Sequence, residues 1–252
     1  KKNKKFVFKK IDITNNIKLN SYLSKINFDY VFHFAAQAGV RYSLIKPHKY
    51  IQTNIVGFFN MMEIFKNKKI KRFFYASSSS VYGDSDKFPL KENEKINPKN
   101  IYGFSKKLNE SIAEFYSKQH SMNLTGLRFF TVYGEWGRPD MFLFKLFKAI
   151  KRKNQFYLNN HGNHKRDFTY IKDLVDILSK LMSKKDKRHN IYNLSSNNPV
   201  NIQKIINDFK STNNFNLVSV DRHIADVLHT HGSNKKILKK TNKKKMVKSD
   251  IG

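Results

Sequence analysis

The chain has 252 residues, 39% of them hydrophobic and 14% aromatic, which suffices for a sizeable core and excludes wholesale disorder. It contains no cysteine, which excludes disulfides and thiolate metal sites. Lys and Arg number 49 against 19 Asp and Glu, a net charge of +30 that is typical of proteins binding nucleic acid, anionic membranes or anionic small molecules. Most of the excess is lysine scattered along the chain. We therefore interpret it chiefly as solvated surface and expect neither a nucleic-acid nor a membrane partner.

No apolar run is long enough to span a bilayer, and no signal-peptide pattern is visible. The absence of cysteine suits a cytoplasmic protein, which we expect. The sequence begins with Lys1 rather than Met, which leaves open a targeting segment upstream of it.

The hydrophobic pattern alternates between strand-like and helix-like segments. Strands are predicted at residues 5–13, 30–36, 72–77, 124–132, 167–170 and 191–194. Helices are predicted at residues 19–26, 50–66, 102–119, 141–152 and 173–183. This alternation predicts an α/β fold, a doubly wound parallel sheet that binds its ligands at the carboxyl ends of the strands. From Asn198 onward the pattern weakens, and the lysines at 235–248 indicate solvated surface more than an anion-binding tail.

The predicted helix at 50–66 is apolar on more than one side. Its main stripe, which includes Ile55, Phe58 and Met62, is joined by Phe59 and Ile64 on other faces. A helix of this kind is covered on more than one side, so we expect it to contact both its own sheet and a partner subunit.

Tyr102 and Lys106 are the strongest candidates for a proton-handling site. A Tyr and a Lys four residues apart share one helix face, so the ammonium can favour the phenolate and create a base near neutral pH. Ser78 lies 24 residues earlier, in the serine-rich segment ASSSSVYG at 76–83. The alternative for a bare Tyr-x-x-x-Lys is an ordinary amphipathic pair. The apolar stripe of this helix lies on another side, however, and does not need the pair.

Two histidine pairs, at 161 and 164 and at 229 and 231, could suggest a metal. Neither has a third ligand nearby in the sequence, so no metal site is predicted.

Several segments match one family in order and approximate spacing. They are HFAAQAGVRYS at 33–43, ASSSSVYG at 76–83, GLRFFTVYG at 126–134, WGRPDM at 136–141 and KRDFTYI at 165–171. With Tyr102 and Lys106, they make the chain resemble the NAD-dependent epimerase/dehydratase family of extended short-chain dehydrogenase/reductases. Among these it is most similar to the UDP-glucuronate 4-epimerases.

The resemblance implies a bound NAD that takes a hydride from C4 of a UDP-sugar and returns it to the other face of a rotated 4-keto intermediate. Tyr102 would remove the C4 hydroxyl proton, and Lys106 would lower its pKa and hold the nicotinamide ribose. Ser78 would hydrogen-bond the reacting oxygen. We also expect a homodimer, formed through the helices at 50–66 and 102–119.

The resemblance assigns further residues by position. At the cofactor it places Asp12 and Ile13 by the adenine, Ala35, Ala36 and Asn54 near the ribose and phosphates, and Phe129 by the nicotinamide. At the substrate it places Ser79, Ser80, Thr131, Arg138, Arg166 and Asp226. For Asn54 the alternative is a satisfied core amide, and for an isolated arginine it is an ordinary surface position.

The serine run indicates which reaction of the family this chain can carry out. Sugar dehydratases of the family place an Asp-Glu pair where this chain has Ser79 and Ser80, and hydroxyls cannot perform the acid and base steps of elimination. A 4-keto glucuronate can lose CO₂, so an epimerase must hold its carboxylate still, and the serines and Thr131 are suitable donors. The alternatives are another nucleotide-sugar epimerase, a decarboxylase or a dehydratase of the same family.

The chain departs from the family at both ends. It has no Gly-x-x-Gly-x-x-Gly turn, and the predicted strand at 5–13 resembles the third strand of the family, so about fifty residues with the first βαβ unit are missing. Ala225 replaces a glycine before Asp226. We predict an incomplete Rossmann-like NAD-binding domain at 1–133 and 165–195 and an incomplete substrate-binding region at 134–164 and 196–252. A second hypothesis is a non-catalytic remnant that acts as a basic binding or interaction protein.

Overall fold

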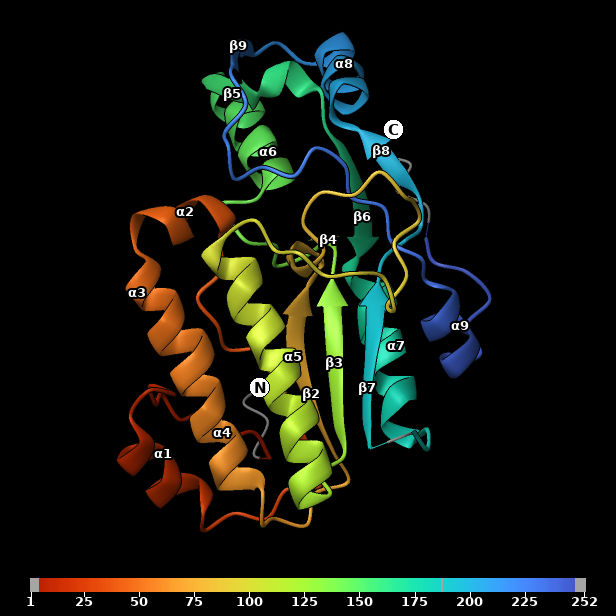
Figure 1. The fold of residues 1–252 in the computed structure, drawn as a ribbon. Coiled ribbons are helices and arrows are strands. Elements are labelled where there is room, and N and C mark those ends of the chain that lie inside the picture. Colours follow the sequence, from red (N-terminus) through yellow and green to blue (C-terminus); the bar gives the residue numbers. More distant parts are fainter. Residues whose placement is uncertain (1–4, 187, 248–252) are drawn as a thin grey trace.

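The structure is a computed structural model that describes residues 5–186 and 188–247. Its central sheet has four parallel strands in the order β1 (Tyr30–His33), β2 (Arg72–Ser78), β3 (Leu124–Phe129) and β7 (His189–Leu194). Helices α4 (Gly57–Phe65) and α5 (Ile101–His120) cover one face, and α7 (Ile171–Ser183) and α9 (Lys235–Thr241) lie against the other (Figure 1). The predicted doubly wound α/β fold is confirmed.

The alternation of side chains along β2 explains why both faces are covered. Phe73 and Tyr75 point into the core formed with α4 and α5, whereas Phe74 points into the core formed with α7. All three rings are completely buried. A strand that is apolar on both faces has to lie between two layers of helices. It also pairs with β1 on one side and β3 on the other, so it is an interior strand of the sheet.

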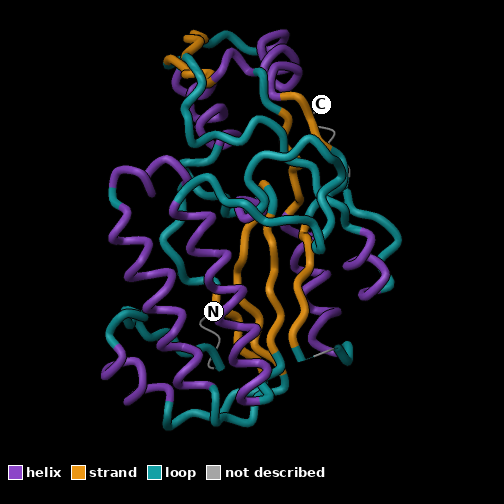
Figure 2. The backbone as a smooth tube through the Cα atoms, in the orientation of Figure 1, coloured by secondary structure: helices purple, strands orange, loops and turns teal. Residues whose placement is uncertain are grey.

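A second region lies beyond the carboxyl ends of the central strands (Figure 1). It contains β4 (Thr131–Tyr133), β6 (Lys165–Tyr170) and β8 (Pro199–Asn201) in one sheet and β5 (Gln155–Asn159) with β9 (Asn216–Val220) in another. Helices α6 (Phe142–Arg152) and α8 (Ile202–Thr212) pack on these strands around their own apolar core. Figure 2 shows long loops between the two regions, where the central strands end.

The short elements complete the chain. They are α1 (Asn16–Leu23), α2 (Val40–Ile45), α3 (Pro47–Tyr50), the π-helical turn η1 (Ile51–Val56), and the 3₁₀ turns η2 (Ser79–Val81) and η3 (Asn160–Gly162). Among the residues that the structure describes, no helix is long and apolar enough to cross a membrane.

The predicted strand at 5–13 is wrong. Residues 6–12 form no regular element, and Phe6, Val7 and Phe8 are 72 to 76% exposed. Their alternating pattern fits a strand, but a strand also needs a neighbour to pair with, and none of the described segments supplies one. Two other predictions were too simple. The helix at 50–66 is divided into α3, η1 and α4, and the strand at 124–132 is divided between β3 and β4, which belong to different sheets.

Candidate active site

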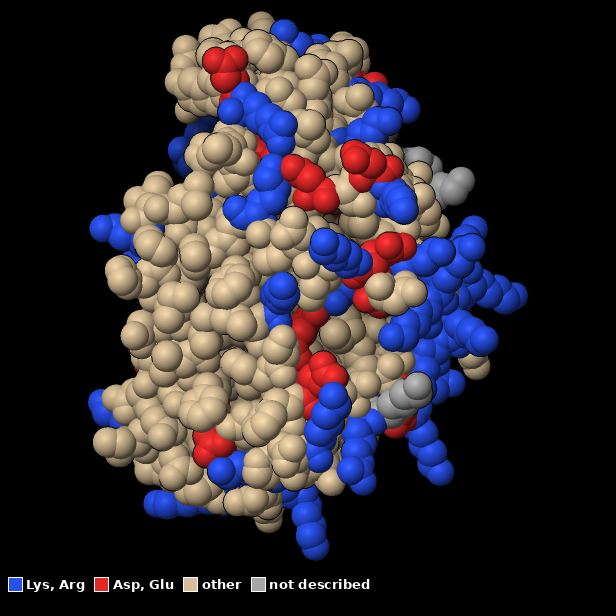
Figure 3. Space-filling view, viewed as in Figure 1, with Lys and Arg blue, Asp and Glu red and all other residues tan. Residues whose placement is uncertain are grey.

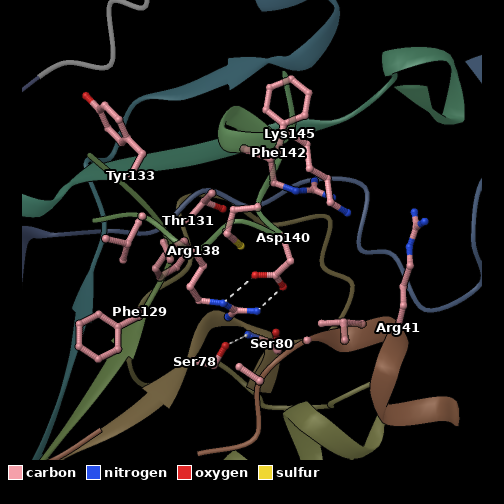
Figure 4. A pocket seen from close by; sticks show the side chains of 18 of the residues that line it. Arg41, Ser78, Ser80, Phe129, Thr131, Tyr133, Arg138, Asp140, Phe142 and Lys145 are labelled. Carbon is pink, nitrogen blue, oxygen red and sulfur yellow. Dashed lines mark hydrogen bonds and ion pairs between the residues drawn. The ribbon is translucent and has the colours of Figure 1, made fainter. Parts of the chain in front are cut away.

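A cavity of about 1510 Å³ lies at the carboxyl ends of the central strands, between the sheet and the second region (Figure 4). This is where ligands of open parallel sheets bind. Eleven of the predicted site residues line it: Ala36, Ser78, Ser79, Ser80, Tyr102, Lys106, Phe129, Thr131, Arg138, Arg166 and Asp226. The fold therefore gathers residues from positions 36 to 226 around one space.

The serine run forms a tight turn at the end of β2. Ser78 caps η2, and its Oγ accepts a hydrogen bond from the Ser80 amide at 3.1 Å. The hydroxyl hydrogen of Ser78 is thereby left to donate elsewhere. Ser79 and Ser80 follow within the turn and also line the cavity.

The first turn of α5 is seated on this serine turn. Asn100 caps the helix, accepting a hydrogen bond from the Gly103 amide at 2.9 Å. A Cβ on Gly103 would lie only 2.4 Å from the Ser80 carbonyl oxygen, so glycine permits the close approach. The contact brings Tyr102, the residue before this glycine, next to Ser78.

Burial sets the protonation behaviour of Tyr102 and Lys106. It raises the pKa of Tyr102, while a hydrogen bond with Ser78 and the charge of Arg138 act in the opposite direction. It lowers the pKa of Lys106 to about 8. The Lys106 ammonium, 3% exposed as a residue, donates to the Ala76 carbonyl oxygen at 2.8 Å. The charge of Arg138 thus favours the Tyr102 phenolate, a role beyond the substrate contact that the resemblance implies for it.

Cationic side chains outnumber acidic ones around the cavity. The cations are Arg41, Lys106, Arg138, Lys145, Lys148 and Arg166, and the acids are Glu135, Asp140 and Asp226. A concave site with this excess favours an anionic ligand. Figure 4 shows Arg138 directed at Asp140 and Arg41 rising from α2.

The arginines have partners within the protein. Arg138 Nε donates to Asp140 Oδ1 at 3.0 Å, and a second contact joins the same two side chains. Arg41 donates to Asp226 from Nε at 3.2 Å and from Nη2 at 2.6 Å. Arg166 donates to the carbonyls of Lys165 and Leu228. Both ion pairs lie at the cavity wall. An anionic ligand can therefore replace Asp140 and Asp226 as the partner of the two guanidinium groups.

Four predicted cofactor residues do not line the cavity. Asn54 has the contacts of a satisfied core amide, since it accepts from the Gln37 amide at 2.7 Å and donates to the Gln37 carbonyl at 3.0 Å. Gln37 itself lines the cavity, so Asn54 shapes the wall from behind. Asp12 accepts hydrogen bonds from Thr14, Ile13 packs in the core beside α4, and Ala35 is exposed.

Two features of this site, Arg41 and the buried pair of Glu110 and Arg128, were not among the predicted site residues. Arg41 lies within the matching segment at 33–43, which follows β1 (Tyr30–His33), and the carboxyl end of that strand could have indicated its place at the cavity. A buried pair of Glu110 and Arg128 lies behind the catalytic candidates. Its sequence signal is the position of Glu110, eight residues after Tyr102 and therefore on the same side of the helix. No group of three or more His, Asp or Glu side chains within 5–186 and 188–247 could hold a metal ion.

Comparisons with known proteins agree with this architecture. The model of the NAD dependent epimerase/dehydratase family matches residues 1–195. The chain is 42% identical to protein CapI of Staphylococcus aureus, over 76% of this chain and 65% of that protein. It is 39% identical to UDP-glucuronate 4-epimerase 4 of Arabidopsis thaliana, over 87% of this chain and 55% of that protein. The chain thus spans about half to two thirds of the length of these curated relatives.

A solved structure shares the fold over nearly the whole chain. It is the UDP-glucuronic acid 4-epimerase from Bacillus cereus in complex with UDP-glucuronic acid and NAD. The two are 28% identical and superpose with a TM-score of 0.90, covering 97% of this chain and 78% of that one. The family match, the parallel sheet and the cavity at its carboxyl end together show that the chain belongs to the NAD dependent epimerase/dehydratase family.

Proposed function

We propose that this protein catalyses NAD-dependent epimerisation at C4 of a UDP-sugar, and that the substrate is UDP-glucuronate, converted to UDP-galacturonate. The observation that carries the proposal is the meeting of Ser78, Tyr102 and Lys106 in a cation-rich cavity at the carboxyl end of a parallel sheet. The likeness to UDP-glucuronate 4-epimerases from a plant and a bacterium supports the choice of substrate.

The residues present fit the nicotinamide end of NAD. Phe129 offers a ring to the cavity, held edge-to-face against Phe34 with centroids 5.6 Å apart. Lys106 would hold the ribose beside it, together with Tyr102. NAD would accept the hydride from C4 of the sugar and would bring a positively charged ring into the cavity.

The chain's own groups would handle the proton and orient the sugar. Tyr102 Oη takes the proton of the C4 hydroxyl as general base, and Ser78 hydrogen-bonds the same oxygen. The charge of Arg138 lowers the pKa of Tyr102 and so increases the fraction of Tyr102 that is phenolate near neutral pH. Burial raises the pKa of Tyr102, so the phenol needs positive charge close by to ionise near neutral pH.

The substrate's carboxylate would be held by hydroxyl donors. Ser79, Ser80 and Thr131 line the cavity together. None of them can act as the acid or base of an elimination, which favours epimerisation over dehydration. Arg166 and Arg138 would take the diphosphate, with Asp226 beside the nucleotide.

We infer that the partner of this chain is a second copy, docked through α4 and α5. Phe59 on α4 and Phe104 and Phe115 on α5 are 43 to 57% exposed. Figure 3 shows a broad face over α4 and the adjoining part of α5 with few charged side chains, although the chain carries +30. An uncharged, aromatic face on so basic a protein suits a like face on another copy, because lysines would otherwise be expected there.

The decisive experiment uses the protein expressed from its complete reading frame. UDP-glucuronate is incubated with it and NAD, and the products are separated by chromatography. We expect UDP-galacturonate. UDP-xylose would indicate a decarboxylase, a 4-keto-6-deoxy sugar a dehydratase, and the absence of any conversion would contradict the enzyme proposal. Trp136 lines the cavity and is fully exposed, so its fluorescence should report UDP binding independently of turnover.

A further inference from the structure

A buried ion pair lies directly behind the candidate active site. Arg128 on β3 donates from Nε and Nη2 to the two carboxylate oxygens of Glu110 on α5, at 2.8 Å each. The two side chains are only 4% and 6% exposed. A bidentate pair of this kind fixes both distance and orientation, since a guanidinium and a carboxylate are planar groups.

The pair is joined to the strand that carries the catalytic serine. Ser77, which precedes Ser78 on β2, donates from Oγ to Glu110 Oε1 at 2.6 Å. One helical turn earlier, Lys106 Nζ donates to the carbonyl of Ala76 on the same strand. Tyr102, Lys106 and Glu110 follow at intervals of four residues and lie on one side of α5. Helix α5 is therefore hydrogen-bonded to β2 through Glu110 and, one turn earlier, through Lys106. Tyr102 lies one further turn toward the start of the helix, on the same side.

Arg128 is itself held from the opposite side. Its Nη1 donates to Tyr82 Oη at 2.8 Å, and its guanidinium lies over the Tyr82 ring, 4.8 Å from the centroid. Tyr82 in turn donates to Asn193 Oδ1 on β7 at 2.7 Å. Arg128, the partner of Glu110, is thus held by contacts with β7 through Tyr82 as well as by its own strand. These contacts fix the position of Arg128 independently of α5.

We propose that Glu110 is a positioning residue for Tyr102, because its bonds to Arg128 and Ser77 set the depth at which α5 lies on β2. That depth determines the separation of the Tyr102 hydroxyl from Ser78. Glu110 does not line the cavity, so it acts through the helix and not on the ligand. The inference rests on the proposed function. Misplacing a reacting group by about 1 Å can cost about 10²-fold in rate.

Glu110→Asp is the sharpest test, because it keeps the charge that Arg128 needs and shortens the side chain by one methylene. The carboxylate can then reach Arg128 only if α5 shifts toward it. We expect kcat of UDP-sugar epimerisation to fall about tenfold with little change in KM. The matched control is Glu114→Asp, one turn later on α5, where the carboxylate pairs with Lys118 at the surface.

The pH profile of kcat separates positioning from simple stabilisation. The groups facing the Tyr102 phenol are Ser78 from β2, Arg138 from the loop after β4, Tyr50 from α3 and Lys106 from its own helix. Ser78 and Arg138 lower the pKa of Tyr102. Moving the phenol away from them should shift the midpoint of the profile to higher pH.

An unchanged kcat and midpoint in folded Glu110→Asp would overturn the inference, even if its free energy of unfolding were lower. Should that variant not fold, Ser77→Ala decides, since it removes one hydroxyl and leaves the ion pair intact. We expect about a threefold loss in kcat from it, with the same shift in midpoint. No change in either would overturn the inference. A failure of the proposed function shows in the unmodified protein, which would then convert no UDP-sugar, and the inference would fall with it.

Discussion

The Lys106 ammonium is buried beneath the cavity, where it donates to the Ala76 carbonyl and where burial lowers its pKa from 10.5 to about 8. At pH 7 it is still mainly charged, and a buried charge opposes folding. The position therefore lowers the stability of the fold and places a cation at the cavity lined by the proposed catalytic residues Tyr102 and Ser78. The same low dielectric that penalises the charge also strengthens its field on a nearby ligand.

Replacing Lys106 by Met should stabilise the fold near neutral pH. A pKa lowered from 10.5 to about 8 corresponds to about 3 kcal/mol of penalty on the charged form. Below pH 8 the lysine is charged in both states and the penalty is complete. Between pH 8 and 10.5 the folded protein releases a proton that the unfolded chain retains, so the stability of the unmodified protein rises with pH.

Urea unfolding at several pH values measures this effect. Lys106→Met should exceed the unmodified protein by up to about 3 kcal/mol at pH 7, less the lost hydrogen bond, and the gap should close toward pH 10. Epimerase activity should be lost at every pH. A variant that is less stable at pH 7, or a gap that widens with pH, would show that the buried lysine carries no penalty.

Tyr102→Phe should remove turnover and leave nucleotide binding intact. The substitution deletes only the hydroxyl that would take the C4 proton, and loss of a positioned general base costs about 10² to 10⁴-fold. Product formation is measured by chromatography and UDP binding by Trp136 fluorescence. Tyr116→Phe, on the same helix but hydrogen-bonded to Glu63, serves as control and should keep its activity. Equal losses in the two variants would argue against a catalytic role for Tyr102.

At the scale of elements, α5 was predictable because its helical pattern is long and its cap is local. Ile101–His120 agrees closely with the predicted helix at 102–119. Element β5, by contrast, has only five residues, and α9 carries mostly lysine, so neither has a periodicity that stands out from a loop. The false strand at 5–13 failed for another reason, since strand formation depends on a partner far away in sequence.

In the site, too, local sequence motifs could be predicted, whereas contacts between residues distant in the sequence could not. The serine turn and the Tyr-x-x-x-Lys pair are local patterns, and both lie at the cavity. The pairings of Arg41 with Asp226 and of Arg128 with Glu110 join residues from different elements, so the sequence does not identify the partners, although the spacing from Tyr102 places Glu110 on the same side of α5. The π-helical turn at η1 was equally hidden, because the apolar residues of 50–66 suit an α-helix as well.

Gly103→Ala tests whether the contact between α5 and the serine turn controls the site. The new methyl would lie 2.4 Å from the Ser80 carbonyl oxygen and 3.0 Å from Pro98 Cβ, so the first turn of α5 must move. We expect a loss of about 1 to 3 kcal/mol in unfolding free energy. Activity should fall at least about tenfold in the molecules that remain folded. Ser111→Ala, at an exposed position of the same helix, is the control, and a fully active Gly103→Ala would refute the close seating.

At the scale of the whole molecule, charge is unevenly distributed. Figure 3 shows Lys and Arg crowded over the side that carries α9, whereas the face over α4 and the adjoining part of α5 has few charged side chains. The proposed dimer would bury the uncharged face and leave the basic sides in solvent. This arrangement keeps most of the like charges of the two copies apart, although it cannot remove their repulsion.

Phe115→Glu should leave the chain monomeric if two copies dock through this face. Its ring is 57% exposed on α5, and a carboxylate there would have to be desolvated on association. Phe144→Glu is the matched control, because Phe144 on α6 is 46% exposed outside the face and the substitution changes the net charge equally. Sedimentation equilibrium distinguishes the two. A Phe115→Glu variant that still forms dimers would exclude this interface.

The net charge of +30 gives the dimer a predictable dependence on salt. Each copy repels the other, and raising the ionic strength from about 0.05 M to 0.5 M shortens the screening length from more than 10 Å to less than 5 Å. Association through an apolar face gains from this screening, because it makes few ion pairs that salt could weaken. We expect the dimer dissociation constant to fall about tenfold over that range, measured by sedimentation at constant temperature. Dissociation on adding salt would instead mean that the copies are held by opposite charges, and that the basic side of the molecule forms the contact.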